Sequence, residues 1–247
     1  MTLIVDEVML REPNLLIPGK KPVGPVKIDW SHPLAPKLFC AVPTQQNIAE
    51  LVHSVLPTLG GEAYISHRGV ETPGTGWDDS VFYPMPFIVP DKNFTIMTGF
   101  VNTSASYNYE STMWFIDDNE NRFISSDSGN KSKFFCNHRN AGISNGSLTV
   151  NFWEDGLDHT LSMTITPNPN SAYFDINISL DETYTVIADT RLIGGTALQT
   201  GVYVRSLGAN NGSPTGYTKY FYMWDKALST ADRIAIKFDP YQFLIPA

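Results

Sequence analysis

Short runs in which every second residue is apolar recur along most of the chain, and clusters of turn-forming residues separate them. Residues 161–165 read Leu-Ser-Met-Thr-Ile, and residues 174–178 read Phe-Asp-Ile-Asn-Ile. Successive side chains of a β-strand point to opposite faces of its sheet, so this alternation predicts strands with one buried face. The connecting segments 167–170 and 210–214 are rich in residues that favour turns. Many short strands with frequent turns indicate a sandwich or a jelly roll.

The expected strands cover residues 26–30, 37–42, 63–67, 93–102, 112–116, 122–125, 147–154, 160–166, 172–179, 184–189, 201–205 and 218–224. One further segment, residues 48–56, is open between a helix and a combination of strand and loop. Ile48, Leu51 and Val55 follow helical spacing, whereas the β-branched content and the break at Pro57 disfavour a helix.

The chain has enough apolar residues for one sizeable core, since 42% of its 247 residues are hydrophobic, and no internal repeat divides it. We therefore expect a single domain over residues 26–247. Residues 1–25 contain four prolines, which impose extended backbone, and they predict an extended N-terminal arm. The arm could pack on its own domain, or it could dock on a neighbouring subunit by strand addition.

Charge and the length of the apolar stretches exclude two classes of partner. The formal net charge is −8 and the basic residues are scattered, which is a poor match to a phosphate backbone, so we expect no nucleic-acid partner. No apolar stretch reaches the roughly 18 residues of a membrane span, so we expect no membrane insertion. Asp6 and Glu7 interrupt the N-terminal apolar run, which predicts no signal peptide. We therefore expect the chain to be made in the cytoplasm and either to stay there or to leave the cell without the usual secretion signal.

The C-terminal segment predicts a core strand followed by a short helix. Residues 220–224 read Tyr-Phe-Tyr-Met-Trp. Ser229 and Asp232 have the spacing of a capping box, and Pro240 stops the helix. The apolar residues that this helix offers for burial are Leu228, Ile234, Ile236 and Phe238.

Three blocks of the sequence resemble one family. Residues 13–34 look like the opening of phage and prophage proteins that carry a laminin G-like domain. Residues 93–100 are similar to a strand of that family, and residues 224–229, Trp-Asp-Lys-Ala-Leu-Ser, are similar to its closing motif. The resemblance is to the concanavalin A-like lectin/glucanase (laminin G-like) domains. It implies an all-β fold, a jelly-roll sandwich of two antiparallel sheets with a short C-terminal helix.

The same resemblance implies a structural protein of a bacteriophage virion, as a capsid decoration, a tail fibre or another tail appendage. Its expected partners are other virion proteins, reached through residues 1–25, and glycans of the host surface. We expect a homo-oligomer located on the virion. The alternatives are a free carbohydrate-binding lectin module and a glycoside hydrolase that degrades polysaccharide.

The sequence predicts that the protein is not an enzyme. The laminarinase-like hydrolases of this fold carry Glu-x-Asp-x-Glu on one strand, where alternation puts the acids on the same face. This chain lacks that motif. Its nearest acidic cluster, Glu154, Asp155 and Asp158, includes Gly156 and is typical of a turn.

Two polar segments with aromatic residues are the candidate glycan sites. Sugars stack on aromatic rings while amides and carboxylates bind their hydroxyl groups. The first candidate loop holds a tryptophan and two acids directly after two glycines, and the second holds two tyrosines around an asparagine. These residues are Trp77, Asp78 and Asp79, and Tyr107, Asn108 and Tyr109. The alternative is that Trp77 caps the core and that the tyrosines cover a sheet edge.

An acidic connector is the one candidate for a metal. The oxygens of Asp117, Asp118 and Asn119 suit calcium, although the segment lacks EF-hand spacing and hairpin tips are commonly acidic. We expect no other cofactor.

Overall fold

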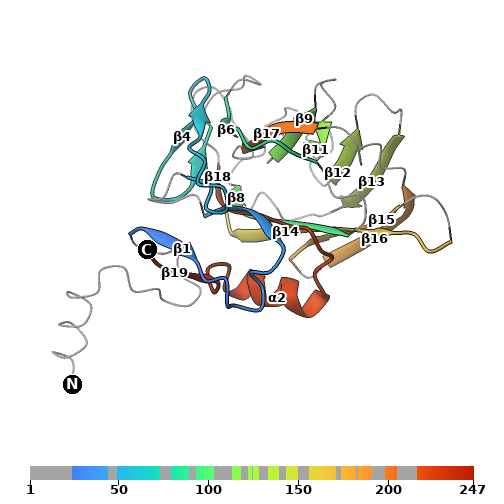
Figure 1. Cartoon of the computed structure of the whole chain (residues 1–247). Helices are drawn as coiled ribbons and strands as arrows, with labels where there is room; N and C mark the ends of the chain where they lie inside the picture. Colours follow the sequence, from blue (N-terminus) through green and yellow to red (C-terminus); the bar gives the residue numbers. More distant parts are fainter. Residues whose placement is uncertain are drawn as a thin grey trace.

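The computed structural model describes residues 24–43, 49–72, 79–88, 93–102, 113–117, 122–123, 125–127, 133–138, 143–149, 156–170, 174–181, 183–190, 198–204 and 216–247. In these residues the chain forms stacked antiparallel sheets, and α2 (Thr230–Phe238) lies on an outer face (Figure 1). The predicted arm over residues 1–25 lies outside this description apart from its last two residues. In the described part, no helix is both long and apolar enough to span a membrane.

The large sheet carries the site described below. In spatial order its strands are β16 (Thr183–Thr190), β15 (Phe174–Leu180), β14 (Asp158–Pro167), β8 (Phe94–Asn102), β18 (Gly216–Trp224), β5 (Val70–Glu71) and β4 (Tyr64–Ile65), with β2 (Leu38–Val42) also paired to β18.

The second sheet packs against one face of the large sheet (Figure 1). Its strands are β10 (Arg122–Phe123), β9 (Met113–Asp117), β17 (Leu198–Val204), β6 (Val81–Tyr83) and β3 (Thr58–Leu59), with β7 (Phe87–Ile88) also paired to β17. Two smaller sheets pair β11 (Ser125–Asp127), β12 (Lys133–His138) and β13 (Ile143–Thr149), and β1 (Val26–Ile28) with β19 (Leu244–Pro246).

The core between the two sheets follows from the alternation in the sequence. Phe221 and Met223 of β18 and Ile96 of β8 are buried in one cluster with Val81 and Val202 of the second sheet. Two facing antiparallel sheets bury the inward-pointing residue of each pair in this way. The expected all-β sandwich with a C-terminal helix is therefore confirmed.

A second core lies on the opposite face of the large sheet. Tyr222 and Trp224 point away from the sandwich and are fully buried with Phe243 and Ile236. The chain after β18 folds back over this face as α2 and the segment that leads to β19 (Figure 1). Both faces of β18 are buried, which is why residues 220–224 are aromatic or apolar without interruption.

Helix α2 meets the sheet with a narrower apolar face than the sequence predicted. The capping box of Ser229 and Asp232 is present. Ile236 is buried, but Ile234 and Phe238 are 40% and 68% exposed, so the expectation that both are buried is wrong. A helix turns by about 100° per residue, so Ile234 and Phe238 lie on a different side from Ile236.

Candidate functional site

A cavity of about 310 Å³ lies between α2 and the outer face of the large sheet. Strands β8, β14 and β15 form one wall, the turn after β15 contributes to it, and α2 forms the other wall. The lining residues are Met97, Thr160, Ser162, Asn177, Ser179, Asp181, Thr230, Arg233, Ile234 and Lys237.

Hydroxyl groups dominate the sheet wall. In β14, Leu161 and Met163 point into the sandwich core, so the residue between them points outward. That residue, Ser162, lies opposite Ser179 of β15, and their Oγ atoms are 2.6 Å apart. Thr160 forms a further hydroxyl contact, 2.9 Å from the Tyr220 hydroxyl. The wall therefore offers groups that can both donate and accept hydrogen bonds.

Two basic side chains line the cavity from the helix. Arg233 and Lys237 are four residues apart, which puts them on one side of α2. Nη1 of Arg233 donates to Asn177 Oδ1 at 2.9 Å and to Thr164 Oγ1 at 3.2 Å, and Nη2 donates to Thr230 Oγ1 at 3.2 Å. Burial lowers the pKa of the Arg233 guanidinium, but arginine stays charged in proteins.

One acid closes the cavity at the turn after β15. Asp181 has φ of 53°, a left-handed conformation that aspartate tolerates in turns. Its carboxylate lies 2.7 Å from His159 Nδ1, accepts the Thr160 amide at 3.1 Å and lies 3.7 Å from Lys237 Nζ. Burial favours a raised pKa for Asp181, but the bonds from His159 and the Thr160 amide outweigh it, and the pKa is lowered. Asp181 is therefore ionised and already paired.

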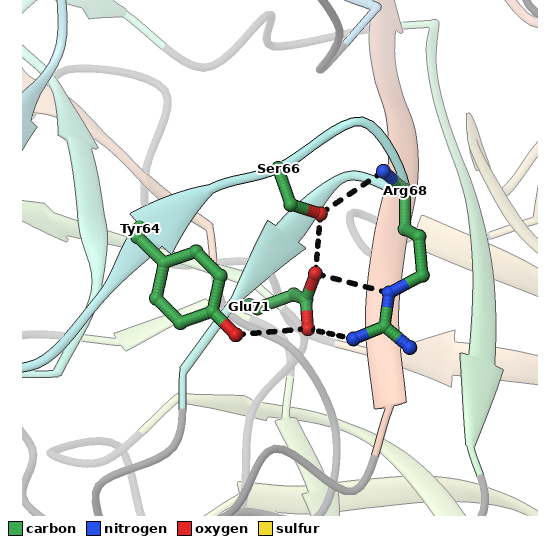
Figure 2. Close-up of polar contacts among 4 residues, drawn as sticks. All are labelled: Tyr64, Ser66, Arg68 and Glu71. Carbon is green, nitrogen blue, oxygen red and sulfur yellow. Dashed lines mark hydrogen bonds and ion pairs between the residues drawn. The ribbon is translucent and has the colours of Figure 1, made fainter.

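A second polar cluster lies at the hairpin of β4 and β5, and Figure 2 shows it. Glu71 is 1% exposed and accepts hydrogen bonds from the Tyr64 hydroxyl at 3.1 Å, from Arg68 Nε at 3.2 Å and from Ser66 Oγ. Nη2 of Arg68 also donates to this carboxylate, and the guanidinium carbon of Arg68 lies 5.3 Å from the centre of the Tyr217 ring. Burial favours a raised pKa for Glu71, but the bonds from Ser66, Arg68 and Tyr64 together lower it.

These bonds predict a pH-dependent contribution of Glu71 to stability. Because its pKa in the folded state lies below its ordinary value of 4.5, the contribution is complete above about pH 4.5. It is lost as the pH falls through the folded-state pKa. We expect Glu71→Gln to lower the free energy of unfolding by roughly 1–3 kcal/mol at pH 7 and by less near pH 3. Urea unfolding of both proteins at the two pH values measures this. A difference that stays constant with pH would contradict the pairing.

The sequence-predicted site residues lie apart from the cavity or outside the described residues. Asp79 is 7% exposed and accepts the Glu62 amide at 2.8 Å, away from the cavity. Outside the described residues lie Trp77, Asp78, Tyr107, Asn108, Tyr109, Asp118 and Asn119, and of Asp117 only the backbone is described, in β9. Glycan binding by residues 77–79 and 107–109 and calcium binding by residues 117–119 thus stay predictions. Within the described ranges, no group of three or more His, Cys, Asp or Glu side chains could hold a metal.

The acidic cluster considered for catalysis is also only partly described. Glu154 and Asp155 lie outside the described residues, and Asp158 begins β14 instead of lying in a turn. Its carboxylate accepts a hydrogen bond from Lys219 Nζ at 2.8 Å.

The cavity residues carried a signal in the sequence. Ser162 and Asn177 are polar members of the two alternating runs, and Arg233 follows the capping box. Nothing in the sequence places α2 over these strands, so the alternation alone does not bring these residues to one site.

No family model matches the sequence, and no curated protein matches it. Solved structures do share the fold. The Trypanosoma rangeli sialidase in complex with sialic acid matches with a TM-score of 0.56 and 9% identity, over 84% of this chain and 33% of the sialidase. The receptor-binding domain of botulinum neurotoxin C/D mosaic serotype matches with a TM-score of 0.62 and 11% identity, over 81% of this chain and 51% of that one.

The binding domain of botulinum neurotoxin DC in complex with SialylT matches with a TM-score of 0.60 and 10% identity, over 84% of this chain and 52% of that one. This chain thus spans about a third of the sialidase and about half of the toxin chains. At such identities the likeness shows the fold alone. The likeness shows a β-sandwich of the kind found in a sialidase and in toxin binding domains. The resemblance to laminin G-like domains of phage proteins stays a prediction.

The comparison corrects the expectation that the protein is not an enzyme. That expectation is wrong, because the solved structures that share the fold include sialidases, which are glycoside hydrolases. Glu-x-Asp-x-Glu is a motif of hydrolases that use a pair of carboxylates, whereas sialidases use a tyrosine nucleophile. The motif therefore could not exclude an enzyme, and a match to a third of the sialidase chain assigns no reaction.

Proposed function

We propose that this chain is a carbohydrate-binding domain and that the cavity beside α2 is its glycan site. The observation that carries the proposal is the composition of the cavity walls. Hydroxyls of Ser162 and Ser179, the amide of Asn177 and the guanidinium of Arg233 surround one space. Groups of this kind bind sugar hydroxyls, and few of them are needed in a site of this size.

The size and the apolar part of the lining also support a sugar. About 310 Å³ is at the lower end of the range for ligand sites, roughly 300–1,000 Å³, so the cavity suits one or two sugar rings. Ile234, which is 40% exposed, supplies apolar surface for the C–H face of a ring. Two of the solved structures that share the fold are complexes with sialic acid and with SialylT, which supports a sugar as the ligand.

Blocking the cavity is expected to weaken glycan binding strongly. Ile234 is 40% exposed on α2, so a larger side chain is tolerated there and covers the cavity. We expect Ile234→Trp to weaken binding at least about tenfold, measured on a glycan array and by calorimetry with the best glycan. The matched control is Ala235→Trp, which adds the same side chain to an exposed position of α2 outside the cavity lining.

Two results would overturn this proposal. If the unaltered chain binds no glycan, it is not a carbohydrate-binding domain. If Ile234→Trp leaves binding intact while Trp77→Ala or Tyr107→Ala removes it, the site lies in the loops that the sequence predicted.

We also keep the virion setting as a proposal, carried by the sequence blocks at residues 13–34 and 224–229. In this setting the domain is displayed as a capsid decoration, a fibre or a tail appendage, and residues 1–25 dock it to its neighbours. Mass spectrometry of purified particles tests it, and absence of the chain from them contradicts it.

A further inference from the structure

The cavity is basic, although the chain as a whole is acidic. The formal net charge is −8. The charged lining residues are nevertheless two cations, Arg233 and Lys237, and one anion, Asp181. The overall composition therefore does not account for the sign of the charge at this site.

The one anion of the lining is engaged by the protein itself. Asp181 lies 2.7 Å from His159 Nδ1 and 3.7 Å from Lys237 Nζ, and it accepts the Thr160 amide. The groups that face it from the packed elements are thus an imidazole of β14, an ammonium of α2 and a backbone amide. None of these contacts involves Arg233.

The hydrogen-bond partners of Arg233 in the described part of the chain are all neutral oxygens. Its three hydrogen bonds go to a threonine of β14, an asparagine of β15 and a threonine of its own helix. No described carboxylate lies within ion-pair distance of it. These bonds use three of the five N–H donors of a guanidinium, so two are left for a ligand. A partly buried cation without a counter-ion is costly, and an anion supplied by a ligand removes that cost.

We infer that the cavity selects a sugar that carries a carboxylate, and that Arg233 is the residue that pairs with it. This inference rests on the proposed carbohydrate-binding function. Planar carboxylates suit a guanidinium because two parallel N–H···O bonds form at once. Ser162, Ser179 and Asn177 then meet the ring hydroxyls, and Lys237 adds positive charge one turn further along α2.

The test compares glycans that differ only in the acid. The probes are sialyllactose, its carboxyl methyl ester and lactose, with a glucuronide and its methyl ester as a second pair. Affinities are measured by calorimetry with the full chain and with Arg233→Gln, Arg233→Lys and Arg68→Gln. Arg68 is the matched control, because it is an ion-paired arginine outside the cavity. Thermal melts confirm that each variant is folded.

We expect at least one acidic glycan to bind about 10–100-fold more tightly than its ester or neutral counterpart. Arg233→Gln should remove that preference, Arg233→Lys should restore part of it, and Arg68→Gln should leave it unchanged. If acids and esters bind equally, or if Arg233→Gln weakens both equally, the selectivity is absent although the domain binds sugar. If none of the probes and no arrayed glycan binds, the proposed function itself fails.

Discussion

Replacing Trp224 with alanine is expected to lower the free energy of unfolding by about 3–5 kcal/mol. The indole is fully buried in the second core, between the large sheet and the C-terminal segment that covers it. Its ring is edge-on to those of Tyr222 and Phe243, with 5.9 and 6.2 Å between centroids. Its Nε1 donates to the Leu34 carbonyl oxygen at 2.7 Å. The substitution leaves a large cavity and an unpaired buried carbonyl, and both add to the loss.

Urea unfolding followed by circular dichroism measures this loss. The matched control is Trp30→Ala, since Trp30 is 55% exposed, and its effect should stay within about 0.5 kcal/mol. Similar losses in the two variants would mean that α2 and the C-terminal segment do not cover the sheet as described.

Gly69→Ala is expected to cost roughly 2–5 kcal/mol, the sum of backbone strain and a steric clash. Gly69 has φ of 150°, and a Cβ there would lie 2.0 Å from the Thr218 carbonyl oxygen. Thr218 pairs with Val70, so relief of the clash requires β5 to move away from β18. The hairpin that holds Arg68 and Glu71 would move with it.

Thermal and urea unfolding of Gly69→Ala and Gly156→Ala separate the two contributions. Gly156 also has a positive φ, of 76°, but it is exposed, so alanine there should cost only about 1–2 kcal/mol. Equal losses at the two positions would show that the close approach to Thr218 is not present in solution.

The alternation in the sequence was sufficient to predict most of the large sheet. The expected strands at 160–166, 172–179 and 218–224 correspond to β14, β15 and β18. The open segment 48–56 was not resolved by periodicity. Residues 51–54 form turns, closed by the bridge between Glu50 and Val55.

A buried acid explains that segment. Glu50 is fully buried and accepts the amides of Ala41, Val52 and His53 at 2.7–2.8 Å. The His53 imidazole also lies 3.1 Å from this carboxylate, but three of its partners are backbone amides, which have no signature in the sequence. Helical spacing of the apolar residues therefore suggested a helix where a carboxylate-centred turn forms.

The cavity could not be predicted for a related reason. Its sheet wall comes from residues 97–181 and its helix wall from residues 230–237, and only the packing of α2 brings them together. In the strands, a polar residue that lines a cavity has the same spacing as one that faces water. Aromatic residues in loops can be recognised in a sequence as candidate binding residues. Hydroxyls on a covered sheet face cannot, because the sequence does not show that the face is covered.

The burial of both faces of β18 has a consequence for how its register is fixed. In an ordinary half-buried strand, sliding by one residue moves the apolar set into water, and this penalty defines the alignment. Residues 220–224 would stay buried after such a slide, so hydrophobicity alone does not define their alignment. Directional features must select it instead: the bulge between Thr218 and Tyr220, the bond from Thr98 Oγ1 to the Tyr220 carbonyl, and the indole bond to Leu34. Mispaired forms of this strand are thus separated from the native one by a few polar contacts.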